Sequence, residues 1–110
     1  MNVDFKGFNE NVATFVADES VEAGKLVTMS EDYTVKACEN NNEIVGLCLS
    51  VRDGYAAVQI AGYIEVNSTS SIAKGYRTFV AYGNDSVTPG DSARAYLVVK
   101  CANGKIGFIL

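Results

Sequence analysis

The sequence contains no histidine and no tryptophan, and it has a single proline among 110 residues. Histidine is the commonest general base, the usual partner of serine and cysteine nucleophiles, and a frequent metal ligand. Its absence removes one component from most hydrolase mechanisms. No other acid, base or nucleophile stands out in its place. We therefore predict that the protein is not an enzyme, with no catalytic residues and no cofactor.

Basic residues are few, nine lysines and arginines against thirteen aspartates and glutamates, which gives a net charge of −4. They are scattered along the chain and form no cluster. A protein that binds the phosphate backbone of a nucleic acid needs several basic side chains on one face. We therefore expect no nucleic-acid partner.

Long apolar runs are also missing. No stretch approaches the roughly 18 to 20 apolar residues that are needed to cross a bilayer. The start of the chain, Met1 to Phe8, carries Asp4 and Lys6 among isolated apolar residues, so it lacks the continuous apolar segment of a secretory signal. We expect no membrane association and no export by that route.

The three cysteines, Cys38, Cys48 and Cys101, form no Cys-x-x-Cys pair, and an odd number does not make a disulfide framework. Each has apolar neighbours, among which cysteine behaves as a small hydrophobic residue. We expect reduced thiols in the core.

The segment richest in carboxylate and amide oxygens is Glu39 to Glu43. It lacks the glycine-centred spacing of a calcium-binding loop. Because asparagine and acidic residues are common in turns, the sequence predicts a turn there and no metal site.

Short segments with apolar residues at every second position make up most of the chain, and no longer window repeats with the period of a helix. Their valine, isoleucine, tyrosine and phenylalanine suit a half-buried sheet. The predicted strands are Val12–Ala17, Leu26–Met29, Thr34–Cys38, Ile44–Val51, Ala56–Ile60, Tyr63–Val66, Thr78–Tyr82, Ala95–Cys101 and Lys105–Leu110. We predict a single all-β domain with little or no helix, apart from one helical turn over Ser70–Lys74.

Two dipeptides, Asp53-Gly54 and Asn103-Gly104, are strong turn signals. Both residue types tolerate the positive φ that a two-residue hairpin loop demands. Each dipeptide is therefore predicted to close a β-hairpin.

The turns and strands recur in the same order about 50 residues apart. Val21–Lys25 aligns with Ile72–Tyr76, and Asp53–Ile60 aligns with Asn103–Leu110. We predict two similar halves, about residues 12–66 and 67–110, that pack on each other. Two units are too few for an open solenoid.

The order of three motifs resembles that of a known family. These motifs are Val21-Glu22-Ala23-Gly24-Lys25-Leu26-Val27, then Glu43 to Leu49, then the stretch from Gly54 to Gly62, after which the pattern restarts at Ile72. In this the chain is similar to the head decoration, or capsid cement, proteins of tailed bacteriophages. The resemblance implies a β-clip-like or β-tulip-like fold and a location on the capsid surface of the virion after synthesis in the bacterial cytoplasm.

The resemblance also implies partners. These are the major capsid protein and further copies of the chain itself, with a trimer favoured, and the family has no catalytic residues to transfer. Residues 1–11 are expected to form an N-terminal arm that precedes the β domain of residues 12–110. Phe5, Phe8 and Asn9 are the candidate contacts with a partner.

Two other functions remain open at this point. The chain could be another structural part of a phage or prophage, such as a tail or head-completion protein. It could also be a carrier domain of the lipoyl or biotinyl type, which is likewise a small β domain of two similar halves. Carrier domains present a lysine at a hairpin tip, whereas the predicted tips here are Asp53-Gly54 and Asn103-Gly104.

Overall fold

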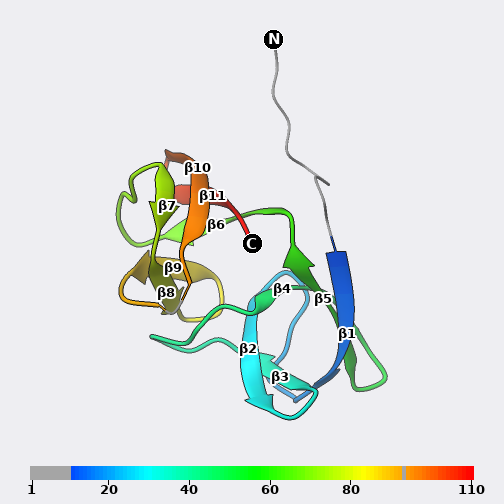
Figure 1. Cartoon of the computed structure of the whole chain (residues 1–110). Helices are drawn as coiled ribbons and strands as arrows, with labels where there is room; N and C mark the ends of the chain where they lie inside the picture. The colour runs from blue at the N-terminus through cyan, green and yellow to red at the C-terminus, as the bar shows by residue number, and fades with distance from the viewer. Residues whose placement is uncertain (1–10, 93) are drawn as a thin grey trace.

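The computed structural model describes residues 11–92 and 94–110, and these residues form eleven β-strands and no helix (Figure 1). The strands are β1 (Asn11–Ala17), β2 (Leu26–Glu31), β3 (Thr34–Ala37), β4 (Gly46–Arg52), β5 (Tyr55–Ala61), β6 (Tyr63–Ser68), β7 (Gly75–Arg77), β8 (Phe79–Tyr82), β9 (Ser86–Pro89), β10 (Tyr96–Ala102) and β11 (Lys105–Ile109). Over these ranges nothing helical is long and apolar enough to span a bilayer. The predicted all-β fold is confirmed.

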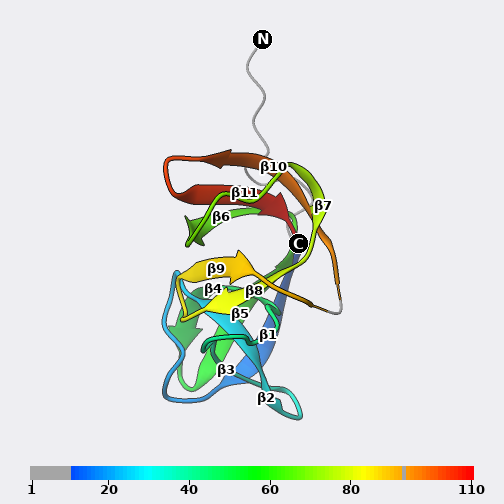
Figure 2. The ribbon, with the colours of Figure 1, turned by 90° about the vertical axis from the view of Figure 1, so that its left-hand side faces the viewer.

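The first five strands close into a barrel in the order β1-β3-β2-β4-β5, and the other six form an open sheet in the order β7-β10-β11-β6-β9-β8. Figure 2 shows the open sheet above the barrel, with β8 and β9 lying against the barrel. In the barrel β1 is parallel to β3 and antiparallel to β5, and in the sheet β6 is parallel to β9 and antiparallel to β11. The two halves therefore share one pairing scheme.

The register of the strands confirms the two similar halves. Ser50 pairs with Ala57 in the barrel and Lys100 pairs with Gly107 in the sheet, a shift of 50 residues. Both hairpins also slip by one residue at the same place, between Cys48 and Ser50 in one and between Val98 and Lys100 in the other. A β-bulge that recurs at the equivalent position of both halves is a feature of the fold and not a local defect. The repeat thus extends to irregularities of the backbone.

The halves differ where the barrel closes. Val27 of β2 pairs with Gly46, and the corresponding pair in the sheet is Arg77 with Tyr96. Further along, Met29 pairs with Val35 while Ala81 pairs with Val87, so the shift has grown from 50 to 52 residues. Two extra residues divide the counterpart of β2 into β7 and β8, and the second half stays open.

Glycine at position 46 allows the closed arrangement. A Cβ atom at this position would overlap the backbone oxygen of Gln59 and press on Val58. The equivalent residue in the open half is Tyr96, whose ring is buried against Phe79 and Phe108 at centroid distances of 5.0 and 5.4 Å. The open half thus accommodates a large ring where the barrel has no room for a methyl group.

The core is divided in the same way. The interior of the barrel is filled by small and β-branched residues, which are Val21, Val27, Val35, Cys48, Ala56 and Val58. A five-stranded barrel is too narrow for more than this. A second and larger cluster contains Phe79, Tyr96 and Phe108, and three residues of the first half join it. This larger cluster fastens the halves to each other.

Both predicted hairpin turns are confirmed. Their φ angles are 53° and 80° at Asp53 and Gly54, and 55° and 74° at Asn103 and Gly104. The nine predicted strands are all present with shifted ends, but β7 and β9 were not predicted. The boundary expected between residues 66 and 67 falls inside β6, which belongs to the second half.

The helical turn predicted over Ser70–Lys74 is wrong, because no helical residue occurs there. Contacts with the following strand hold this segment in another shape. The Arg77 guanidinium donates hydrogen bonds to the carbonyl oxygens of Ala73 and Lys74 at 3.3 and 3.2 Å, and Ile72 is buried in the larger core cluster.

Two leucines test this description of the core. Leu26→Ala removes a fully buried side chain and is expected to lower the free energy of unfolding by about 2 to 5 kcal/mol. Leu49→Ala makes the same change at a side chain that is 40% exposed and should cost less than about 1 kcal/mol. Urea unfolding of both variants measures the difference, and equal losses would contradict the placement of Leu26.

Gly46→Ala tests the closure of the barrel. We expect a loss of about 3 kcal/mol, since the new methyl group overlaps backbone that packing holds in place. Gly54→Ala is the matched control, because Gly54 has a φ of 80° and open space around it, and the strain of that φ costs about 1 to 2 kcal/mol. Urea unfolding measures the loss in the free energy of unfolding for each variant. A smaller loss for Gly46→Ala than for Gly54→Ala would be inconsistent with tight closure.

Candidate functional site

The predicted partner contacts Phe5, Phe8 and Asn9 lie outside the described residues, as does the expected arm up to residue 10. Asn11 is already the first residue of β1.

Exposed apolar side chains are concentrated on the barrel. Among the described residues, eight of the ten large hydrophobic side chains that are exposed belong to the first half, and Tyr76 and Tyr82 are the two in the second. The eight are Val12, Val16, Met29, Tyr33, Leu49, Val51, Tyr55 and Ile60. Single exposed apolar residues are ordinary, but a contiguous set marks an interaction surface.

Part of this set forms one face of the sheet, which we call the outer face. Val12, Thr14 and Val16 alternate outward along β1, and Val16 pairs with the exposed Tyr55 of β5. Neither β1 nor β5 contains a charged residue. A strand that faces solvent usually carries polar residues on that side. The outer face is therefore unusual for a surface.

The second half provides an internal comparison, because each position of the outer face has an equivalent there. Thr14 and Val16 correspond to Glu65 and Asn67, and Tyr55 corresponds to Lys105. Glu65 forms an ion pair with Lys100 at 3.7 Å across this face. The same strands thus carry charges in the second half, whereas in the first half the one charged residue beside them on this face is Arg52 of β4.

A tyrosine also covers the equivalent face of the second half. A Cβ atom at Gly107 would overlap the side chain of Tyr63, so this ring lies over the glycine. The corresponding residue in the first half is Val12, which leaves Ala57 partly exposed. The fold can cover this face with its own side chain, but only in the second half does it do so.

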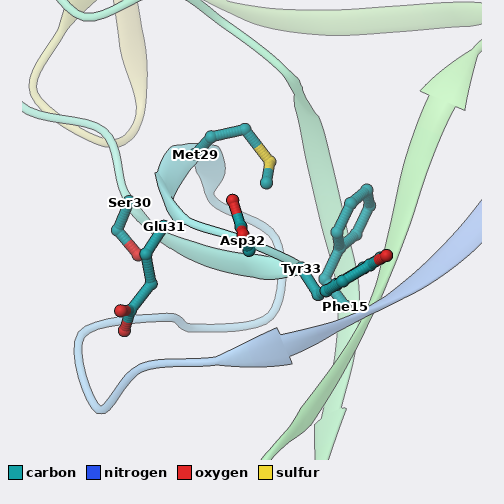
Figure 3. A pocket seen from close by; sticks show the side chains of 6 residues that line it. All are labelled: Phe15, Met29, Ser30, Glu31, Asp32 and Tyr33. Carbon is teal, nitrogen blue, oxygen red and sulfur yellow. The ribbon is translucent and has the colours of Figure 1, made fainter.

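Two more of the exposed apolar residues, Met29 and Tyr33, lie at the end of the barrel near the β2–β3 turn. An open hollow of about 590 Å³ is lined there by Phe15, Met29, Ser30, Glu31, Asp32 and Tyr33. In the view of Figure 3 the rings of Phe15 and Tyr33 lie on one side of the hollow, Met29 and Asp32 lie on the other, and Ser30 and Glu31 extend away. We call this hollow the barrel mouth.

Backbone geometry projects Tyr33 into solvent. Its φ is 59°, in the left-handed region that few residues other than glycine and asparagine adopt. Its carbonyl oxygen accepts a hydrogen bond of 2.8 Å from the backbone N–H of Val16, which fixes the turn against β1. The ring remains 81% exposed beside the mouth. A strained, anchored turn thus presents a bare aromatic ring.

Two carboxylates, those of Glu31 and Asp32, line the barrel mouth. Further along, the backbone N–H groups of Ala17 and Asp18 donate to the carbonyl oxygens of Gly54 and Val35, so the end of β1 and the turn after β4 meet at this end of the barrel (Figure 1). We call Glu31 and Asp32 the acidic rim.

Among the described residues, neither carboxylate of the acidic rim forms an ion pair with a lysine or arginine. Arg52 belongs to the outer face, where it pairs with Tyr55 across the hairpin. Lys36 forms an ion pair of 3.8 Å with Glu39, and its charge also acts on Asp18. The backbone N–H and hydroxyl of Ser20 donate to Asp18 and lower the pKa of its carboxyl group.

The cysteines are free thiols, as expected, and Cys38 and Cys48 are buried while Cys101 is partly exposed. Burial raises the pKa of Cys38 to about 12 and also raises that of Cys48. The thiolate is the reactive form of cysteine, so neither buried thiol is a nucleophile at neutral pH.

The turn at Glu39 to Glu43 closes on itself. The Asn42 side-chain oxygen accepts a hydrogen bond of 2.7 Å from the Glu39 N–H, and Asn41 has a φ of 71°. Over the described ranges, no three His, Cys, Asp or Glu side chains are grouped closely enough to hold a metal ion.

The outer face was not predicted, although the sequence contains a signal for it. Residues 12–17 read Val-Ala-Thr-Phe-Val-Ala, with apolar side chains on both faces of one strand and no charge. In a barrel only one of these faces can point inward. The exposure of Tyr33 had no such signal, because it depends on the φ of the turn.

A comparison with known protein families and with curated proteins finds no family model and no curated protein that matches this sequence.

The burial of the thiols leads to a simple test. In the native protein at about pH 8 we expect a chromogenic disulfide reagent to react quickly with Cys101 alone, and with all three cysteines after unfolding in urea. A Cys101→Ser variant should then show almost no fast reaction. A fast reaction of this variant at one full equivalent would contradict the burial of Cys38 and Cys48.

Proposed function

We propose that this chain is a structural protein of a tailed-phage virion that decorates the capsid and stabilises it by binding the major capsid protein. The observation that carries the proposal is the concentration of exposed apolar side chains on the barrel half, where eight of the ten found among the described residues lie. The resemblance in the order of the three sequence motifs supports it.

The contrast between the halves supports a role based on binding. β1 and β5, which form the outer face of the barrel, contain no charged residue. The equivalent strands of the second half, β6 and β11, contain Glu65 and Lys105. Core regions of protein interfaces are depleted of charge and enriched in tyrosine and phenylalanine. A chain that binds through one half and faces solvent with the other would have this distribution.

Assembly into a homo-oligomer, with a trimer favoured, is part of the proposal. An oligomer that holds several contacts on a lattice converts the later contacts into intramolecular ones, and the affinity rises without new chemistry. A modest surface on each copy is then sufficient for stable decoration.

Co-sedimentation with expanded capsids that lack a decoration protein tests the proposal. We expect the purified wild-type chain to sediment with them, and its absence from the pellet would refute the proposal. Assembly of the chain into rings or tubes, seen by negative-stain electron microscopy, would favour a tail or head-completion role instead.

A second experiment places the polar residues of the second half on the outer face. The double variant Val16→Asn and Tyr55→Lys copies the equivalent residues Asn67 and Lys105, which the same fold already tolerates. We expect a folded protein whose binding to capsids falls about tenfold or more, because two exposed apolar anchors are lost. Tyr82→Lys, at an exposed tyrosine of the second half, is the control and should bind as the wild type does.

A further inference from the structure

We propose that the barrel mouth is the docking site for a segment of a partner protein in which a large apolar side chain is flanked by lysine or arginine. This inference rests on the proposed function, since it assigns one contact by which the chain would hold the capsid protein. It concerns the end of the barrel and is separate from the outer face of β1 and β5.

The apolar part of the site is preformed. Phe15 is only partly buried and packs against the small core cluster of the barrel, while Met29 and Tyr33 are exposed beside it. The hollow of about 590 Å³ between them is within the usual size of pockets for side chains and small ligands. One aromatic or long aliphatic side chain of a partner fits such a space.

The charge around the mouth determines which residues can flank that side chain in the partner segment. Among the described residues, the two charged side chains that line the hollow are the carboxylates of the acidic rim, Glu31 and Asp32, and no lysine or arginine lines it. A partner with acidic residues around its apolar side chain would be repelled, and lysine or arginine would be attracted. Complementarity therefore selects a basic segment.

The same charge argues against a second copy of this chain at the mouth. An isologous contact would bring two acidic rims together. The chain also has a net charge of −4, so its other surfaces supply little positive charge. The occupant we infer is accordingly a different protein.

The test uses the full chain and a synthetic probe, the peptide Lys-Lys-Phe-Lys-Lys with an acetylated N-terminus and an amidated C-terminus. We expect nuclear magnetic resonance shifts at Phe15, Met29 and Tyr33 on titration, with affinity falling about tenfold between roughly 0.05 and 0.5 M salt. The peptides Glu-Glu-Phe-Glu-Glu and Lys-Lys-Ser-Lys-Lys, which lack the positive charge or the ring, should bind about tenfold more weakly or not at all.

Variants of the chain distinguish the site from other surfaces. Tyr33→Asn removes the ring and keeps a residue suited to positive φ, so the fold is retained while peptide binding falls about tenfold. Tyr76→Asn is its control, at a tyrosine of β7 that is 71% exposed. Glu31→Gln with Asp32→Asn should weaken binding and flatten its salt dependence, whereas Glu22→Gln with Asp91→Asn changes the net charge equally and should have no effect.

Failure of this inference is distinct from failure of the proposed function. No binding of Lys-Lys-Phe-Lys-Lys, or equal effects of Tyr33→Asn and Tyr76→Asn, would overturn the docking site. If Tyr33→Asn still co-sediments with capsids as the wild type does, the docking site is likewise excluded while decoration stands. If the peptide binds at the mouth but no chain sediments with capsids, decoration is excluded and the docking site stands.

Discussion

The closure of a barrel from only five strands is the constraint on which the rest of this structure depends. β4 is held between β2 and β5, and Gly46 occupies the point where no Cβ atom fits beside the backbone of Gln59. The interior that results has room for valine, alanine and cysteine, and for no aromatic ring beyond the partly buried Phe15 at its end. Larger apolar side chains of the first half therefore lie either in the core shared with the second half or on the outside.

The shared core contains the first of these two groups of side chains. It includes the side chains of Leu26, Cys38 and Ile44, which pack with the aromatic cluster of the second half and not inside the barrel. The Tyr96 hydroxyl also donates a buried hydrogen bond of 3.0 Å to the Ile44 carbonyl oxygen. The edge of β8 is covered as well, because Asn41 donates to the Ala81 carbonyl and the Ala81 N–H donates to Asn42. The two halves form one unit, so that a contact made by the barrel is transmitted to the whole molecule.

The sequence predicted the features that depend on local chemistry. The two dipeptides with positive φ set both hairpins, and alternation along the chain located nine of the eleven strands among the described residues. β9 was missed because Pro89 and neighbouring turn residues hide its pattern, and its equivalence to β3 appears only in the register, where Thr34 and Ser86 occupy matching places. The repeat is visible in the sequence because the buried Val21 and Ile72 occupy matching places.

What could not be predicted depends on contacts between distant segments. The first half closes with Gly46 at its tightest point, and the second half stays open with two extra residues around Thr78. The effect of these two residues appears only in the register of the strands. The barrel mouth brings together two separate segments, Phe15 in β1 and residues 29–33 around the β2–β3 turn. The sequence-based candidates Phe5, Phe8 and Asn9 remain predictions, since they lie outside the described residues.

The central claim is that the barrel half of this chain binds a partner and the second half faces solvent. Amide hydrogen exchange of the chain, free and bound to capsids, measures this directly. The account predicts slower exchange in the bound state along β1 and in the β2–β3 turn, with β7, β10 and β11 unchanged. Protection confined to β6–β11, with the barrel unchanged, would contradict it.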